Sequence, residues 1–412
     1  MIAIGLSPNT EKDDILQALK ALLQPWKWKK GDAVYQVENW FRTYLNNNHV
    51  VAVNSGRSAM YLILKSFSIH GGDEVIVQAF TCLAVPEVVS WCGAKPVFID
   101  IDETLNMDTK LLERAISAKT RAIIVQHTFG VPANIEMIKK IAQKHNIILI
   151  EDCAHGLGAE FKGQKIGTWG DAAFFSFGRD KVISSVFGGL AILNSNSKYF
   201  KIASAKMDEL SQKLNYPSMF WIIQQILHPL SFEFILPLYN LIIGKIILHL
   251  LQKFKLLSFP IYREEKKGLK PEIFPKLYPS ALAILLLNQL KKIERLNNHR
   301  QELAKQYFQE FNNKKNIVLP QNIPGSIFLR FNILTDNVSE IKTEAKRSGI
   351  LLGNWYHDVI DPEGSQNIVG YKLGDCPYAE KMARQSLNLP TNIRTDKNDI
   401  SKIAKLIYEH SN

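Results

Sequence analysis

The sequence predicts an α/β protein whose mostly parallel central sheet is flanked by helices and followed by a smaller C-terminal α/β domain. Between residues 50 and 200, short apolar runs alternate with stretches of helical character, as in repeated strand–helix–strand units. After about residue 270 the pattern changes to a long helical stretch and one further apolar strand. A chain of 412 residues, 46% of them hydrophobic, is long enough for two domains with large cores.

The apolar runs give the order of the elements. We expect strands at residues 50–53, 74–77, 96–99, 122–125 and 147–150. A helix follows the first strand, with Ser58 as its candidate cap. A long helix from Ser280 through Arg300 and a strand at 327–334 open the C-terminal part. We therefore predict a large domain at residues 1–268 and a small domain at residues 269–412.

An acid and a lysine in the middle of the chain indicate a cofactor site. Asp152 comes directly after the apolar strand at 147–150, where α/β sheets place ligands, although such an acid can also cap the next helix. Lys181 follows a Phe-rich strand that carries Ser176, and a Gly pair opens the next strand. Pyridoxal phosphate (PLP) needs an amine for a Schiff base and a carboxylate that keeps the ring nitrogen protonated. Together these residues predict a PLP site.

Ordered segments over nearly the whole chain resemble the sugar aminotransferases of the DegT/DnrJ/StrS type, which belong to the aspartate aminotransferase-like, fold-type I PLP-dependent enzymes. They are Asn54–Met60 with Gly72–Val77, Pro96–Asp102, Glu151–Asp152, Ser176–Lys181, and Cys376–Glu380 leading to Leu387–Pro390. The resemblance implies the PLP-dependent transferase fold of type I. It also implies a homodimer with the active site at its interface.

The resemblance assigns catalytic roles to two residues. Lys181 would bind the cofactor and move the proton between cofactor and substrate carbons, and Asp152 would pair with the ring nitrogen. His155 would lie near the ring oxygen; a structural hydrogen-bonding role is the alternative.

The resemblance also assigns the phosphate site. The backbone amides of Gly56, Arg57 and Ser58 at a helix N-terminus, together with the Ser176 hydroxyl, would hold the phosphate, because such amides and the helix dipole attract a dianion. Each has an ordinary alternative: Ser58 can simply cap the helix, Arg57 can point to solvent, and Ser176 can bond to the backbone.

Three positions depart from the family pattern. Cys82 stands where relatives carry an aromatic residue that stacks on the ring and would be a poorer cofactor contact, unless a group such as Phe80 supplies the stacking. The segment Phe274–Tyr278 replaces one that supplies a phosphate-binding Asn from the neighbouring subunit; Lys276 is a candidate substitute. Residues 182–187 also lack the usual Gly-Glu before the Gly pair.

The stretch at residues 216–262, between the two predicted domains, is unusually apolar and is flanked by lysines. A spanning helix needs about 20 apolar residues. Prolines and polar residues interrupt this stretch, so no simple transmembrane segment is predicted. Two interpretations stay open: an interfacial helical hairpin in peripheral contact with a membrane, or an apolar insert that packs on its own domain or across a dimer.

Composition narrows the classes of partner and compartment. The net charge of +11 favours anionic partners such as a nucleotide diphosphate or an acidic membrane surface, and no nucleic-acid-binding motif is present. The four cysteines show no paired or metal-type spacing, which predicts a reducing compartment and no metal site. The N-terminus lacks the pattern of a secretory signal. We expect a cytoplasmic protein, peripheral at the inner face of the membrane if the insert binds lipid.

These observations predict a PLP-dependent aminotransferase that converts a nucleotide-linked ketosugar to an aminosugar, with glutamate as donor, in polysaccharide or cell-surface sugar biosynthesis. One alternative is a PLP-dependent sugar dehydratase, but those relatives carry His at the position of Lys181. The other is a non-catalytic scaffold or sensor, suggested by Cys82, Pro275 and the apolar insert. The loop Gly353–Asp358 has a composition that suits a sugar and equally suits an ordinary loop.

Overall fold

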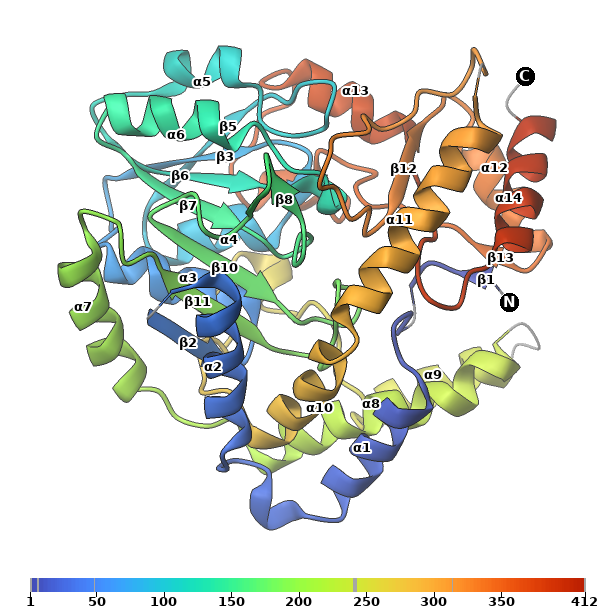
Figure 1. The fold of residues 1–412 in the computed structure, drawn as a ribbon, viewed down its shortest axis with the longest axis horizontal. Coiled ribbons are helices and arrows are strands. Elements are labelled where there is room, and N and C mark those ends of the chain that lie inside the picture. Colours follow the sequence, from blue (N-terminus) through green and yellow to red (C-terminus); the bar gives the residue numbers. More distant parts are fainter. Residues whose placement is uncertain (1, 6, 48, 240–242, 313, 411–412) are drawn as a thin grey trace.

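A seven-stranded sheet forms the centre of the computed structural model, which describes residues 2–5, 7–47, 49–239, 243–312 and 314–410 (Figure 1). Its order is β2-β11-β10-β7-β6-β3-β5, and β11 alone runs antiparallel to its neighbours. The strands are β2 His49–Val53, β3 Glu74–Gln78, β5 Lys95–Ile99, β6 Thr120–Gln126, β7 Ile148–Asp152, β10 Ala172–Ser176 and β11 Gly189–Leu193. The predicted α/β class and the five predicted strands are confirmed.

Helices cover both faces of this sheet (Figure 1). They and the helices that follow are α1 Lys12–Leu22, α2 Ala33–Leu45, α3 Gly56–Ser66, α4 Ala84–Trp91, α5 Thr109–Ala115, α6 Ile135–Lys144, α7 Phe200–Gln212, α8 Met219–Leu238, α9 Ile243–Lys253, α10 Ser280–Leu290, α11 Ile293–Glu310, α12 Val338–Arg347, α13 Pro377–Gln385 and α14 Lys397–Glu409. Successive strand residues point to opposite faces. Leu149 accordingly packs with Ile138 of α6, whereas Ile150 packs with Leu62 of α3.

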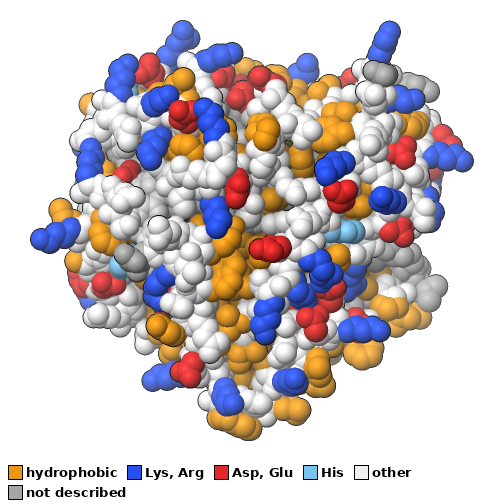
Figure 2. Space-filling view, viewed as in Figure 1, with side chains coloured by type: hydrophobic (Ala, Val, Ile, Leu, Met, Phe, Trp, Pro, Cys, Tyr) orange, Lys and Arg blue, Asp and Glu red, His pale blue; other side chains and the backbone are white. Residues whose placement is uncertain are grey.

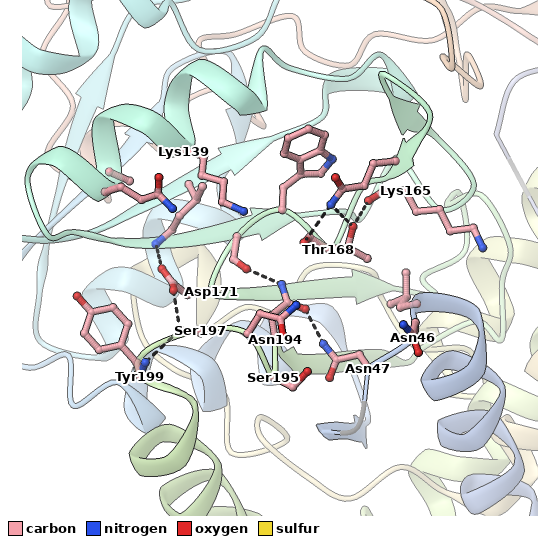
Figure 3. Close-up of a pocket in the computed structure, with 18 of the residues that line it drawn as sticks. Asn46, Asn47, Lys139, Lys165, Thr168, Asp171, Asn194, Ser195, Ser197 and Tyr199 are labelled. Carbon is pink, nitrogen blue, oxygen red and sulfur yellow. Dashed lines mark hydrogen bonds between the residues drawn. The ribbon is translucent and has the colours of Figure 1, made fainter.

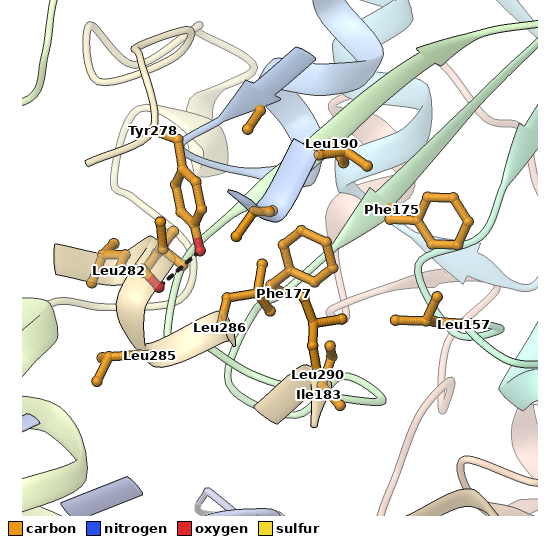
Figure 4. Packing of buried hydrophobic residues seen from close by; sticks show 14 of the residues in the cluster. Leu157, Phe175, Phe177, Ile183, Leu190, Tyr278, Leu282, Leu285, Leu286 and Leu290 are labelled. Carbon is orange, nitrogen blue, oxygen red and sulfur yellow. Dashed lines mark hydrogen bonds between the residues drawn. The ribbon is translucent and has the colours of Figure 1, made fainter. Parts of the chain in front are cut away.

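The largest core lies between β10–β11 and the helices α2, α8 and α10 (Figure 4). Phe175, Phe177 and Leu190 from the strand side meet Leu286 from α10 there. Tyr278 is buried in the same cluster, and its hydroxyl donates a hydrogen bond to the carbonyl of Leu282 at 3.1 Å. A packed apolar layer therefore supports β10 and β11, the strands next to the lysine motif.

Short strands and the C-terminal helices complete the molecule. The antiparallel pair β12 Phe331–Leu334 and β15 Ser386–Leu389 packs with α11, α12 and α14 around a separate core. The other short strands are β1 Ile2–Ala3, β4 Thr81–Cys82, β8 Glu160–Phe161, β9 Gln164–Lys165, β13 Ile350–Leu351 and β14 Ile360–Asp361. The 3₁₀ turns are Pro25–Lys27, Thr128–Gly130, Glu265–Lys267 and Ser365–Asn367.

Residues on either side of the predicted domain boundary, between 268 and 269, contact one another. The N-terminal β1 pairs in parallel with β13, and α10 packs against α1 and α2. The two domain ranges remain a proposal.

Two predicted elements differ from the structure. The long helix predicted from Ser280 through Arg300 breaks at Lys291–Lys292, so that α10 packs into the large core while α11 carries the chain to the C-terminal core. The strand predicted at 327–334 begins only at Phe331. Phe328 adopts a φ of 48°, in the left-handed region that strands do not use.

Candidate active site

A cavity of about 280 Å³ opens at the carboxyl ends of the parallel strands. Asp152 is the last residue of β7, and Ser176 is the last residue of β10. Of the predicted site residues, Gly56, Arg57, Cys82, Asp152, His155, Ser176 and Lys181 line the cavity. Residues from separate stretches of sequence thus meet in one pocket, as a cofactor site requires.

Lys181 and His155 lie in direct contact, with Nζ and Nε2 2.9 Å apart. Burial lowers the pKa of Lys181, and burial together with the lysine's charge lowers the pKa of His155 well below its usual value. The backbone N–H of Phe129 points at Nδ1 of His155 from 3.4 Å, which places the imidazole proton on Nε2. A neutral histidine can then donate to a neutral lysine amine, which is the nucleophilic form of the side chain.

The loop after Lys181 is held by residues that are remote in sequence. Asn9 donates through Nδ2 to the carbonyls of Lys181 and Val182, at 2.8 and 3.1 Å. The buried guanidinium of Arg300 donates to the Val182 carbonyl at 2.6 Å and to Oδ1 of Asn9 at 3.0 Å. This network positions the lysine backbone.

Asp152 is a buried residue of the cavity lining. Its Oδ1 accepts a hydrogen bond from the Ala154 backbone at 2.9 Å. Burial raises the pKa of this carboxyl, while the Ala154 hydrogen bond and the charge of Lys181 lower it. A buried carboxylate of this kind favours a cationic partner.

The N-terminus of α3 forms one end of the cavity. Ser55 is its N-cap and accepts from the Ser58 backbone at 3.0 Å, so the cap is Ser55 rather than the predicted Ser58. Ser58 lies outside the cavity lining, and its hydroxyl donates to Oδ1 of Asn54 at 2.7 Å. A Cβ on Gly56 would come within 2.9 Å of Cβ of Ser176, so a side chain here would crowd Ser176 at the end of β10. The first backbone amides of such a helix are available to a phosphate.

Aromatic rings form another wall. Trp355 stacks on His155 with centroids 5.3 Å apart, and Tyr356 also lines the cavity. The Nζ atom of Lys181 lies 5.0 Å from the centroid of the Trp355 ring. Phe80, the predicted substitute for the missing stacking residue, is fully buried against Tyr356 and does not line the cavity.

The segment that follows α9 closes the third side. Pro260, Ile261 and Glu265 line the cavity. Glu265 forms an ion pair with Arg57, which also donates to the Pro260 carbonyl at 3.0 Å. Arg57 therefore turns into the protein and not to solvent.

These residues fit PLP. They supply an amine, a buried carboxylate for the ring nitrogen, a helix N-terminus with a hydroxyl for the phosphate, and a glycine where the chain needs close approach. Three buried side chains nearby, those of His127, Glu151 and Cys153, are of types that can bind a metal ion, but the Glu151 carboxylate already accepts hydrogen bonds from three backbone amides, at 2.7–2.8 Å.

The comparison with known families agrees with this chemistry. The model of the DegT/DnrJ/EryC1/StrS aminotransferase family matches residues 9–215 and 279–408. The chain belongs to this family. Membership of the family confirms the predicted enzyme class, a PLP-dependent aminotransferase, and the predicted cofactor. The unmatched residues between the two matched ranges contain the whole predicted insert.

Relatives of this DegT/DnrJ/EryC1/StrS aminotransferase match either nearly the whole chain or about half of it. It is 28% identical to the spore coat polysaccharide biosynthesis protein SpsC of Bacillus subtilis, over 98% of this chain and 95% of SpsC. It is 36% identical to the GDP-perosamine synthase of Caulobacter vibrioides over 46% of this chain and 50% of the synthase. Among solved structures, DesV of S. venezuelae is 25% identical with a TM-score of 0.73, covering 97% and 94% of the two chains. Spr1654 of Streptococcus pneumoniae in its PLP form has a TM-score of 0.78 at 21% identity, covering 98% of both chains.

Several residues of the aminotransferase pocket escaped the sequence interpretation. Arg179, two residues before the lysine, lines the pocket and donates at 2.6 Å to both the carbonyl and the hydroxyl of Ser258. Its place in the lysine motif could have revealed it. Pro260, Ile261 and Glu265 carried no local signal, since only folding brings them to the motif.

A larger and more polar cleft, of about 750 Å³, lies at the opposite edge of the sheet (Figure 3). It is lined by Asn47, Asp171 and Asn194, and the Asn47 amide donates to Asn194 at 2.5 Å. None of the predicted site residues line it. Size alone therefore does not identify the active site.

We expect Gly189→Ala to destabilise the protein and to weaken PLP binding. A Cβ at this position would lie 2.2 Å from the backbone C and O of Ser55, so β11 or the start of α3 must move. Such overpacking costs about 1–3 kcal/mol. Urea unfolding and PLP titration measure the two effects. Gly71→Ala, whose Cβ would meet no atom closer than 3.8 Å, is the matched control. Equal behaviour of the two variants would contradict the prediction.

We expect Glu87 in α4 to make the stability of the protein depend on pH. Burial, reinforced by the charge of Glu265, raises its pKa to about 8 from 4.5 in a free side chain. The folded protein therefore binds this proton more tightly than the unfolded chain does. The resulting stabilisation is fully present at a pH below 4.5 and is lost as the pH rises through the pKa of about 8 in the folded protein. Glu87→Gln should therefore raise Tm relative to the wild type more at about pH 9 than at about pH 5. Thermal unfolding checks this against the exposed control Glu103→Gln; a pH-independent difference would refute it.

Proposed function

We propose that this aminotransferase converts the keto group of a nucleotide-linked sugar to an amine, with glutamate as the amino donor. The observation that carries the proposal is the contact of Lys181 with His155 beside the buried Asp152. The relatives include GDP-perosamine synthases and a UDP-N-acetyl-3-dehydro-α-D-glucosamine 3-aminotransferase, which supports a nucleotide sugar as the substrate class. Polysaccharide or cell-surface sugar biosynthesis is the corresponding role.

We assign the site residues as follows. Bound PLP supplies an aldehyde that accepts the amine and a ring that accepts electrons. Lys181 provides the amine that holds it and the base that carries a proton between the reacting carbons. His155 keeps that amine oriented and is neutral, so it does not repel it. Asp152 keeps the ring nitrogen protonated.

The phosphate end is assigned to the backbone amides of Gly56 and Arg57 and to the hydroxyl of Ser176. The Ser58 amide, the third predicted donor, already donates to the Ser55 hydroxyl. Cys82 faces the cavity where relatives place a ring. The neighbouring rings of Trp355 and Tyr356 are our candidates for the missing apolar contact. A second copy of the chain would complete the site as a homodimer.

The test uses purified protein with added PLP and follows the visible absorption band. Glutamate should bleach this band, and a later addition of a nucleotide-linked ketosugar should restore it and yield an aminosugar detectable by mass spectrometry. Because one relative is named for L-glutamine, glutamine forms a second arm. Bleaching by glutamine but not by glutamate would show that glutamine is the amino donor. Failure of every ketosugar to restore the band would overturn the proposed substrate class.

A further inference from the structure

The helix α9 presents an apolar stripe to solvent. Ile243, Ile246, Leu250 and, just past the helix end, Phe254 recur at intervals of three or four residues, so they share one face. Their side chains are between 43% and 68% exposed. Gly244 is the only buried residue within α9. A face of this kind on a helix that adds little to the core marks an interaction surface.

The preceding helix α8 packs into the main core and so connects the exposed helix α9 to the rest of the enzyme. Trp221, Ile222 and Ile226 are buried in the main core, where α8 packs on α1 and α10. By length and composition α8 is the one described helix that could cross a membrane, but 44% of its apolar window is buried inside the molecule. Core helices pass the same test. The arrangement is thus a half-buried helix that is followed by an exposed one, and it needs no spanning segment.

Charge selects the kind of partner. Residues 234–263 contain three lysines and one arginine and no aspartate or glutamate. Lys245, His249 and Lys253 recur every four residues, beside the apolar stripe. Figure 2 shows hydrophobic and basic side chains interspersed at the lower right, where Figure 1 places α9. An apolar stripe flanked by cations is the pattern of a helix that lies in a lipid interface. A second copy packed on the same face about a twofold axis would bring like charges together.

We propose that the exposed face of α9 docks on an anionic lipid surface, with its apolar stripe in the acyl boundary and its lysines at the headgroups. The docked helix leads directly into the pocket wall. Ser258 accepts hydrogen bonds from Arg179, and Pro260 and Ile261 line the cavity. The enzyme would thus work at a membrane surface whatever sugar it aminates.

The test is vesicle flotation of the full-length, PLP-loaded enzyme with phosphatidylcholine vesicles, with and without phosphatidylglycerol. The variant is Ile246→Asp, Leu250→Asp and Phe254→Asp together. The matched control places the same three charges on exposed apolar residues elsewhere: Ile202→Asp, Val318→Asp and Leu373→Asp. Circular dichroism and the visible cofactor band verify that each protein is folded.

We expect the wild type and the control to float with the anionic vesicles, and the bound fraction of the α9 variant to fall at least about tenfold. Equal flotation of the two variants, or no flotation of the wild type, would overturn the proposal. Light scattering measures the oligomeric state and so tests the alternative partner, a second copy of the chain. If the α9 variant dissociates a dimer and the wild type does not bind vesicles, this face joins two copies of the chain and the lipid proposal fails.

Discussion

Replacing Lys181 with alanine is expected to abolish the visible band of the PLP-loaded protein and to lower transamination by at least about 10³-fold, because the variant loses both its covalent attachment and its proton carrier. The structure offers no second amine in contact with His155 among the described residues that line the cavity, so rescue by a neighbour is not expected. Borohydride reduction followed by peptide mass spectrometry locates the attachment directly.

Lys110→Ala, on an exposed helix, serves as the control for this experiment. It should retain both the band and the activity. A Lys181→Ala protein that keeps its band, or a cofactor attached to another lysine, would remove the central assignment of the site. Thermal unfolding of the variant separates a chemical loss from a folding defect.

Replacing Asp152 with asparagine is expected to lower the rate of the glutamate half-reaction on the order of 10²- to 10³-fold, as the loss of one preorganised charge contact does in other enzymes. The amide oxygen can still accept from the Ala154 backbone, so the local structure is retained. The amide carries no charge, however, and cannot stabilise a protonated ring nitrogen. Stopped-flow absorption measures the rate.

The exposed residue Asp208 gives the control, Asp208→Asn. The pH profile adds a second readout. Because burial raises the pKa of Asp152, its carboxylate form is lost as pH falls from a higher value than for an ordinary aspartate. The acid limb of PLP binding should therefore shift or vanish in the variant. An unchanged half-reaction rate would show that another group pairs with the ring.

The local features of the site could be predicted because they depend on short stretches of sequence. An apolar run followed by an acid places Asp152 at a strand end, and the run from Ser176 to Lys181 places a lysine after the next strand. In both cases the alternation of buried strands and helices dictates which edge of the sheet the residues reach. The same alternation correctly predicted β2, β3, β5, β6 and β7, but not the two-residue β4.

Errors arose where contacts across the fold overrode local preference. The helix cap is the exception, because that error is local: α3 begins at Gly56, and the Ser55 hydroxyl accepts a hydrogen bond from the Ser58 backbone. The predicted long helix broke where its two halves pack into different cores. Neither the break at Lys291–Lys292 nor the late start of β12 carries a proline or a glycine that would signal it.

The sequence by itself determined the α/β class, the family and the cofactor, and it predicted a lysine and an aspartate for the site, since each of these depends on periodicity or on short motifs. The tertiary structure alone decided the walls of the pocket. It brought Trp355 beside His155, paired Glu265 with Arg57, and left one face of α9 uncovered while part of α8 packed into the main core. The physical reason is that these contacts join segments far apart in the chain. Their energies depend on which surfaces the folded layers bring together, and no local pattern encodes that choice.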